Sequence, residues 1–197
     1  MRSMAVRGGS AKQDAIISAA TRLFSHYGYR KTTVDLIAHE ADVAKPTLYA
    51  HFGDKEAIFV AVCRHVLDGI LAAAETELER DDVIDRIAGV LSAKFTRVFE
   101  LVESSPHARE LLESQDAQAR EVVAKADAAF VKLLTEALRA AFRRGELGPE
   151  RIEPRPAKLA QLLMQAGHGA GYGATSVDDH RANLRALVAA LLGRPAS

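Results

Sequence analysis

The chain of 197 residues has one cysteine, no tryptophan and a formal net charge of zero. A single cysteine, Cys63, excludes an intramolecular disulfide. There is no charged leader followed by an apolar stretch, and no unbroken apolar run of about 18 residues, so the sequence predicts neither a signal peptide nor a membrane span. These absences favour a cytoplasmic protein that needs no membrane partner.

The residues that are abundant favour helices. Leu, Ala, Val and Ile dominate the apolar residues, alanine-rich stretches run through most of the chain, and no segment alternates convincingly as a strand would. The sequence therefore predicts an all-α fold with about nine helices. The neutral total also conceals an uneven distribution, because residues 1–33 carry six basic side chains against one acid, Asp14. Such a basic end attracts phosphate, although many solvated N-terminal arms share it.

Three helices are expected near the N-terminus. Apolar residues at helical spacing, Tyr27 among them, predict a helix that begins at Ser10 and ends at Gly28. Thr33 can cap a second short helix, and Pro46 suits the first turn of a third. We divide the chain into a domain over residues 10–56, whose motif spans 33–52, and a domain over 57–197.

The remaining helices are longer. One is expected after Asp54, one from Asp82 to Ser104, a short one after Pro106, one over residues 116–144, and two over residues 155–172 and 178–192. Glycines at positions 167, 169, 171 and 173 weaken a helix there. They indicate either a close approach of backbones at an interface or an unwound helix end.

Residues 33–52 contain the densest functional signal. Two short amphipathic helices joined by a turn at Asp42 are too short to be stable alone and must pack on the first helix. Their inner faces are expected to hold Ile37, Ala38, Val43, Leu48 and Phe52. The outer face of the second helix then presents polar side chains that can bind bases in a major groove. An ordinary helical hairpin with a solvated polar face is the alternative interpretation.

The run from Thr32 to Ile58, TTVDLIAHEADVAKPTLYAHFGDKEAI, resembles the DNA-binding domain of the TetR family of transcription regulators. The resemblance covers about residues 11–60. One departure is Asp42, where that family has glycine in the turn. Because aspartate tolerates a left-handed backbone better than most residues, we expect the turn to form at a small strain cost.

The resemblance implies a ligand-responsive regulator, usually a repressor, that binds a palindromic operator in double-stranded DNA as a homodimer. It also implies roles for particular side chains. Thr33 and Lys55 would bind phosphate, and Pro46 would contact a thymine methyl group. The groove-facing residues would be Lys45, Thr47, Tyr49 and His51.

The C-terminal part matches only the family's general plan of an effector cavity and a dimeric bundle of the last two helices. Their apolar faces, which include Leu163 and Leu184, have few other predicted partners and suit a symmetric interface. An unidentified small, mainly apolar effector is expected in the cavity. The candidate lining residues are Cys63, Val66, Phe95, Phe99, Phe130, Leu134, Met164 and His168.

A helical enzyme or metal carrier is the main alternative class. Cys63 and His65 point to different faces of a helix, and no Glu-x-x-His sequence exists for a carboxylate-bridged metal site. His65 and Asp68 can share a face and bind a metal, but an ordinary surface or core pair is the better explanation. We therefore expect no catalysis, no cofactor and no bound metal. A dimeric binding module that no longer contacts DNA is a third possibility, against which Lys45, Tyr49, His51 and Lys55 argue.

Overall fold

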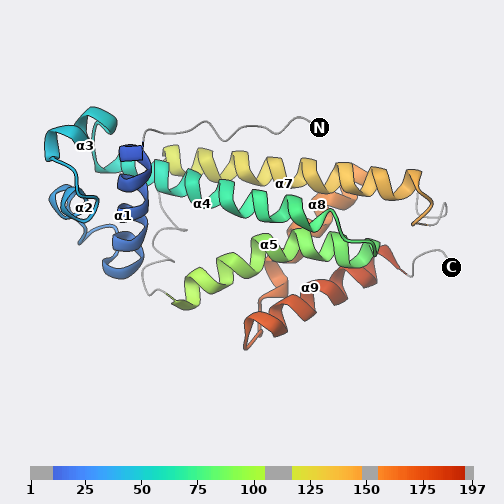
Figure 1. Ribbon diagram of the computed structural model, residues 1–197. Helices are drawn as coiled ribbons and strands as arrows, with labels where there is room; N and C mark the ends of the chain where they lie inside the picture. Colours follow the sequence, from blue (N-terminus) through green and yellow to red (C-terminus); the bar gives the residue numbers. More distant parts are fainter. Residues whose placement is uncertain (1–10, 105–116, 148–154, 194–197) are drawn as a thin grey trace. The chain divides into compact units, whose positions relative to one another are not determined.

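The computed structural model describes residues 11–104, 117–147 and 155–193, and in this part of the chain all regular structure is helical (Figure 1). The predicted all-α fold is confirmed, and the described residues form eight of the roughly nine helices expected. Ser10, the predicted start of the first helix, and the short helix predicted after Pro106 lie outside the described residues. The helices are α1 (Ala11–Tyr27), α2 (Val34–Glu40), α3 (Lys45–His51), α4 (Lys55–Glu77), α5 (Val83–Ser104), α7 (Ala117–Arg143), α8 (Pro156–Ala170) and α9 (Val177–Leu192).

The chain forms two compact units, which we describe separately. The first unit comprises Met1–Val66 and Val102–Val123, and the second comprises Leu67–Leu101 and Ala124–Ser197. The division falls within α4, ten residues later than the boundary predicted from the sequence. The reason is that Ile58, Phe59 and Val62, in the first turns of α4, join the core of the three N-terminal helices.

Side-chain caps fix several helix starts at the predicted positions. The Thr33 hydroxyl accepts a hydrogen bond from the Leu36 N–H (3.2 Å), and the Asp54 carboxylate accepts one from the Ala57 N–H (2.7 Å). Asp82 caps α5 in the same way, through the Asp85 N–H. Each cap satisfies a backbone donor that has no partner within its helix.

The core of the first unit is made by apolar residues of α1, α2, α3 and the start of α4. Ile37, Ala38, Leu48 and Phe52 are buried and Val43 is partly buried, so the predicted inner faces are confirmed. The fully buried side chains of this unit also include Ile16, Phe24 and Ile58.

Tyr27 is an exception, because its side chain is exposed at the last position of α1 and stacks edge-on against His26. Tyr29 takes the core position in its place. Gly28, with a φ of 83°, turns the chain so that the Tyr29 ring lies 5.4 Å from Phe24 and 4.9 Å from Phe59. The turn after the helix therefore supplies the aromatic ring that the helical period assigned to Tyr27.

In the second unit α8 packs on α9, and their strongest apolar residues are buried within the single chain. Leu159, Leu163, Leu184, Val188 and Leu192 are all buried. The expectation that these two faces lack other partners is thus corrected. Leu162, Ala166, Leu187 and Leu191 keep partly exposed side chains.

The glycines near the end of α8 serve contacts within the chain. A Cβ atom at Gly167 would overlap the ring of Phe95, and one at Gly171 would lie 3.1 Å from the ring of His180. Gly173 adopts a left-handed φ of 81° in the turn after the helix. Gly167 and Gly171 therefore allow close packing within the chain, and Gly173 lies in the turn that follows the helix.

By length and composition α4 is apolar enough to cross a membrane, with a mean hydropathy of 1.8 over its most apolar window. Length and composition alone are weak evidence, because a core helix of a soluble protein meets the same criterion. Ile58, Phe59, Val62 and Ile70 of this helix are indeed buried against other parts of the chain.

Candidate nucleic-acid interface and ligand cavity

The turn between α2 and α3 determines how α3 is presented. Asp42 has a φ of 52° and is the one non-glycine residue with positive φ in the described part of the chain. The predicted left-handed turn at this aspartate is therefore confirmed. The Val43 N–H donates to the Ala38 carbonyl (3.0 Å), which closes the turn and starts the next helix against the first.

The two faces of α3 differ sharply in exposure. Leu48 is completely buried, while Tyr49, the next residue, exposes 44% of its surface. Lys45, Pro46 and His51 are also exposed, and Thr47 is half-buried. The structure thus brings the predicted groove-facing side chains onto the outside of one short helix, with Thr47 at the edge of that surface.

Lys45 is paired with an acid that the sequence analysis did not single out. Its ammonium group lies 2.7 Å from the carboxylate of Asp35 in α2. The hydrogen bond and charge of Asp35 raise the pKa of Lys45. Asp35 therefore orients Lys45, and any phosphate or base must compete with this carboxylate for the ammonium. The three-helix packing that brings Asp35 and Lys45 together was predicted, so the pair could have been found from it.

Thr33 and Lys55 were the two expected phosphate contacts. Thr33 is exposed, and its hydroxyl oxygen caps α2 by accepting from the Leu36 N–H. The same hydroxyl can still donate its hydrogen to a group outside the protein. The Lys55 ammonium is half-buried and donates to the carbonyls of Tyr29 (2.8 Å) and Thr32 (2.9 Å). It also lies 4.3 Å from the centre of the Tyr29 ring. Lys55 thus fastens the turn after α1 to the start of α4, a structural role that the sequence analysis missed.

The predicted pocket residues are divided between the two units. Cys63 and Val66 pack at the edge of the first unit's core. In the second unit Phe95, Phe130, Leu134 and Met164 are buried core residues. The remaining two contact other rings, since His168 packs edge-on against Phe95 and Phe99 packs against His180.

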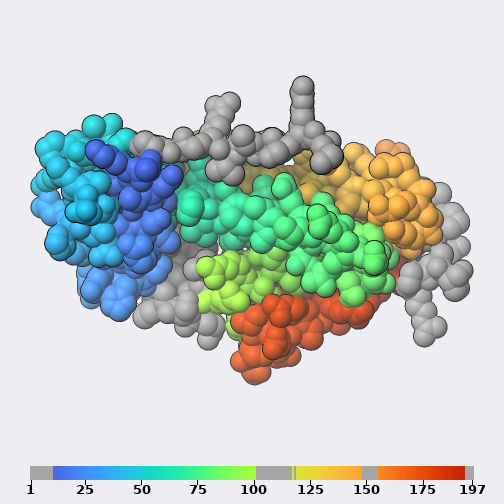
Figure 2. Space-filling model, in the orientation of Figure 1, coloured from blue at the N-terminus to red at the C-terminus, as the bar shows by residue number. Residues whose placement is uncertain are grey.

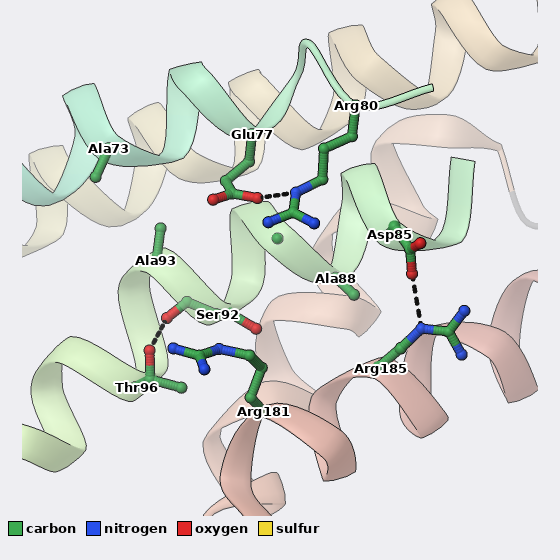
Figure 3. Close-up of a pocket in the computed structure, with 11 residues that line it drawn as sticks. Ala73, Glu77, Arg80, Asp85, Ala88, Ser92, Ala93, Thr96, Arg181 and Arg185 are labelled. Atoms are coloured by element: carbon green, nitrogen blue, oxygen red, sulfur yellow. Dashed lines mark hydrogen bonds and ion pairs between the residues drawn. The ribbon is translucent and has the colours of Figure 1, made fainter. Parts of the chain in front are cut away.

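A cavity of about 230 Å³ lies elsewhere in the second unit, between the end of α4, one face of α5, and α9 (Figure 3). None of the predicted pocket residues lines it. Small residues of α5 form most of its floor, together with Asp85 of the same helix, and charged residues from the α4 end and from α9 form its walls. Its lining residues are Ala73, Glu77, Arg80, Asp85, Ala88, Gly89, Ser92, Ala93, Thr96, Arg181 and Arg185.

Buried charged groups hold the long helices of the second unit together. The Arg86 guanidinium lies 2.7 Å from the Glu146 carboxylate and also donates to the carbonyls of Arg80 and Asp81. Burial raises the pKa of Glu146, but the hydrogen bonds from Arg86 and Arg144 more than offset this and the net pKa is lowered. Lys94 forms an ion pair with Asp127 between α5 and α7.

His180 is the buried polar side chain whose ring nitrogens find no hydrogen-bond partner in the described structure. Burial lowers its pKa, so the neutral ring is favoured.

The described residues contain no group of three or more His, Cys, Asp or Glu side chains placed to hold a metal ion. His65 and Asp68 are both exposed on α4.

Comparisons with known proteins agree with this geometry. Residues 16–62 match the family model described as bacterial regulatory proteins, tetR family. The chain is 46% identical over 66 residues to the HTH-type transcriptional regulator RutR of Escherichia coli K12. The aligned segment covers 34% of this chain and 31% of RutR. It is 47% identical over 57 residues to the HTH-type transcriptional regulator HbdR of Aromatoleum sp. strain CIB, covering 29% of this chain and 25% of HbdR.

These matches span about a third or less of the length of the curated relatives. The fold extends further, because the structure of a transcriptional regulator from Cytophaga hutchinsonii aligns over 93% of this chain and 96% of its own, with a TM-score of 0.73 at 19% identity. A helix-turn-helix thus stands in the N-terminal part of a chain whose described residues are helical and whose fold resembles that of this regulator. The N-terminal segment, residues 16–62, is similar to the DNA-binding part of the tetR family of bacterial regulatory proteins.

Proposed function

We propose that this protein is a DNA-binding transcription regulator that reads operator DNA with α3. The observation that carries the proposal is the contrast within α3. Leu48 is fully buried, whereas the side chains of Tyr49 and Lys45 on the same helix are exposed. A helix supported by its partners on one side and polar on the other can enter a major groove about 12 Å wide. Tyr49, His51, Lys45 and Thr47 would then face base edges, with Pro46 against a thymine methyl group.

Phosphate contacts would fix the position of α3 on the duplex. Thr33, at the start of α2, would donate its hydroxyl hydrogen to a phosphate. Lys55 would add positive charge beside the same strand while it holds the turn after α1 in place.

The proposal extends to assembly and regulation. The protein would act in the cytoplasm as a homodimer on a palindromic operator, with the partly exposed Leu162, Ala166, Leu187 and Leu191 of α8 and α9 in the interface. It would act as a repressor, and a small, mainly apolar effector bound in the C-terminal part would release it from DNA. These features are typical of the family whose model the N-terminal segment matches.

Selection of bound duplexes from a random pool, followed by affinity measurements on the selected site, tests the proposal. Tyr49→Ala and Lys45→Ala should each weaken binding by about 1 to 3 kcal/mol, as expected for a lost base contact. Their melting temperatures should stay near that of the unsubstituted protein because both side chains are exposed. Tyr27→Ala is a matched control, since Tyr27 is as exposed as Tyr49 but lies on α1.

The affinity should also fall steeply with salt, with each phosphate contact contributing about 0.9 to the slope of log K against log salt concentration. Failure to enrich any sequence, together with an affinity that does not depend on salt, would refute DNA binding. A loss caused by Tyr27→Ala equal to that caused by Tyr49→Ala would refute the assignment of α3 as the reading helix.

A further inference from the structure

The cavity between the end of α4, α5 and α9 has arginines on two opposite walls and, on its α5 floor, small residues beside one charged residue, Asp85. Arg80 follows α4 on one side, and Arg181 and Arg185 lie one turn apart on α9 on the other. In Figure 3 the guanidinium groups of Arg80 and Arg181 reach over the face of α5 from these two sides. Figure 2 shows the surfaces of α5 and α9 next to each other, so that the α9 wall lies at the protein surface.

Two carboxylates also line the cavity, and both bind an arginine through Nε. Glu77 is paired with Nε of Arg80, and Asp85 accepts from Nε of Arg185 at 2.6 Å. No further hydrogen bond to the Nη groups of these two arginines occurs within the part of the chain that the structure describes. Each carboxylate therefore orients its guanidinium while the two Nη groups remain available to a bidentate acceptor.

The third arginine adds an excess of positive charge. Arg181 is paired through Nη1 with Asp178, which is almost fully exposed and does not line the cavity. Three guanidinium groups thus face two carboxylates inside the cavity. The balance favours an anion over a neutral molecule or a cation.

The floor is shaped for a thin molecule. Ala88, Gly89, Ser92, Ala93 and Thr96 lie on one face of α5, and none has a side chain larger than threonine. A Cβ atom at Gly89 would overlap the Glu77 carboxylate, so glycine at this position allows Glu77 to lie against α5 and hold Arg80. A volume of about 230 Å³ accommodates a short chain of roughly ten non-hydrogen atoms.

We propose that this cavity binds a small organic dianion, of the class of short-chain dicarboxylates, with one carboxylate on Arg80 and the other on Arg185 and Arg181. The two anionic ends match the two charged walls, and the short hydrocarbon chain between them matches the small residues of α5. The site belongs to the second unit alone and does not depend on DNA binding by α3. Because the three arginine side chains are each more than half exposed, salt screens the attraction and the affinity falls as ionic strength rises.

Calorimetric titration of the full chain with glutarate at low, matched ionic strength tests the proposal. Saturable binding is expected at one site per chain, with weaker binding of acetate and none of glutaramide, which has the same length but no charge. Arg80→Gln and Arg185→Gln should each reduce glutarate affinity by roughly tenfold, the effect of losing a charge-assisted contact.

Arg97→Gln is the matched control. Arg97 also lies on the second unit, is 56% exposed and is paired with an acid three residues away, but it does not line the cavity. It should leave glutarate affinity unchanged. Gly89→Ala should weaken binding because it displaces Glu77, and circular dichroism and sedimentation should show that each variant remains folded in its original association state.

Absence of saturation, equal binding of glutaramide, or an equal loss in Arg97→Gln would overturn the proposal. So would variants of Arg80 and Arg185 that change the association state and leave glutarate affinity intact, because the cavity would then be part of a protein interface.

Discussion

The two units of this protein place their buried polar groups differently. Among the described residues the first unit buries one polar side chain, Thr32, whereas the second buries Arg86, Ser92, Lys94, Thr96, Thr135 and His180. Thr32 donates to the Gly28 carbonyl four residues earlier, while Arg86 finds Glu146 sixty residues away. The buried polar side chain of the first unit is therefore satisfied by a nearby residue, whereas Arg86 of the second unit depends on a partner that only the tertiary fold brings to it.

Substitution of Leu48 is expected to have the largest effect and tests whether the first unit depends on its apolar core. Leu48→Ala removes a fully buried side chain and should cost about 2 to 5 kcal/mol of unfolding free energy. Tyr49→Ala, one residue along, should change it by no more than about 0.5 kcal/mol. Urea denaturation measures both, and the reverse order would show that the faces of α3 are wrongly assigned.

Substitution of Arg86 tests whether the stability of the second unit depends on a buried charged pair. Arg86→Met leaves the Glu146 carboxylate and the carbonyls of Arg80 and Asp81 without their shared donor, and should cost about 2 to 3 kcal/mol. Arg97→Met removes an exposed pair and should cost less than about 0.5 kcal/mol. If both variants are equally stable in urea, the buried pair does not stabilise the second unit.

The buried His180 should make the unfolding free energy of the second unit depend on pH. Because burial lowers its pKa in the folded state, the unfolded chain binds the proton more readily. This contribution to stability is fully present above the ordinary pKa of 6.5 and is lost as the pH falls below it. The slope from one proton cannot exceed about 1.4 kcal/mol per pH unit. His180→Leu should flatten the dependence of unfolding free energy on pH in this range, and an unchanged curve would contradict the assignment.

Asp42 gives the smallest expected change and probes the local geometry of the first unit. Asp42→Gly relieves the left-handed backbone at φ 52° but gives the unfolded chain more freedom, so a net stabilisation below about 1 kcal/mol is expected. Asp42→Val should instead destabilise, since a β-branched side chain tolerates positive φ poorly. Thermal melts of the two variants compare them directly, and a valine variant as stable as the glycine variant would argue against strain at this turn.

Much of the fold followed from residue periodicity and caps. Thr33, Asp54 and Asp82 begin helices where their side chains predicted, and Leu48 and Phe52 point inward as the spacing required. Short-range hydrogen bonds and amphipathic faces involve residues a few positions apart, so a single sequence contains the information. The exposed surface of α3 follows from the same spacing.

The rest depended on contacts between distant residues. No spacing rule joins Arg185 to Asp85, assigns Lys55 to the carbonyls of Tyr29 and Thr32, or replaces Tyr27 by Tyr29 in the core. The charged cavity likewise needs arginines from the end of α4 and from α9 to meet across α5. The sequence by itself determined the helices, the inner faces of the first unit and the exposed polar surface of α3, because these follow from local geometry. Only the tertiary structure decided which charges pair, since that depends on how helices far apart in the chain pack together.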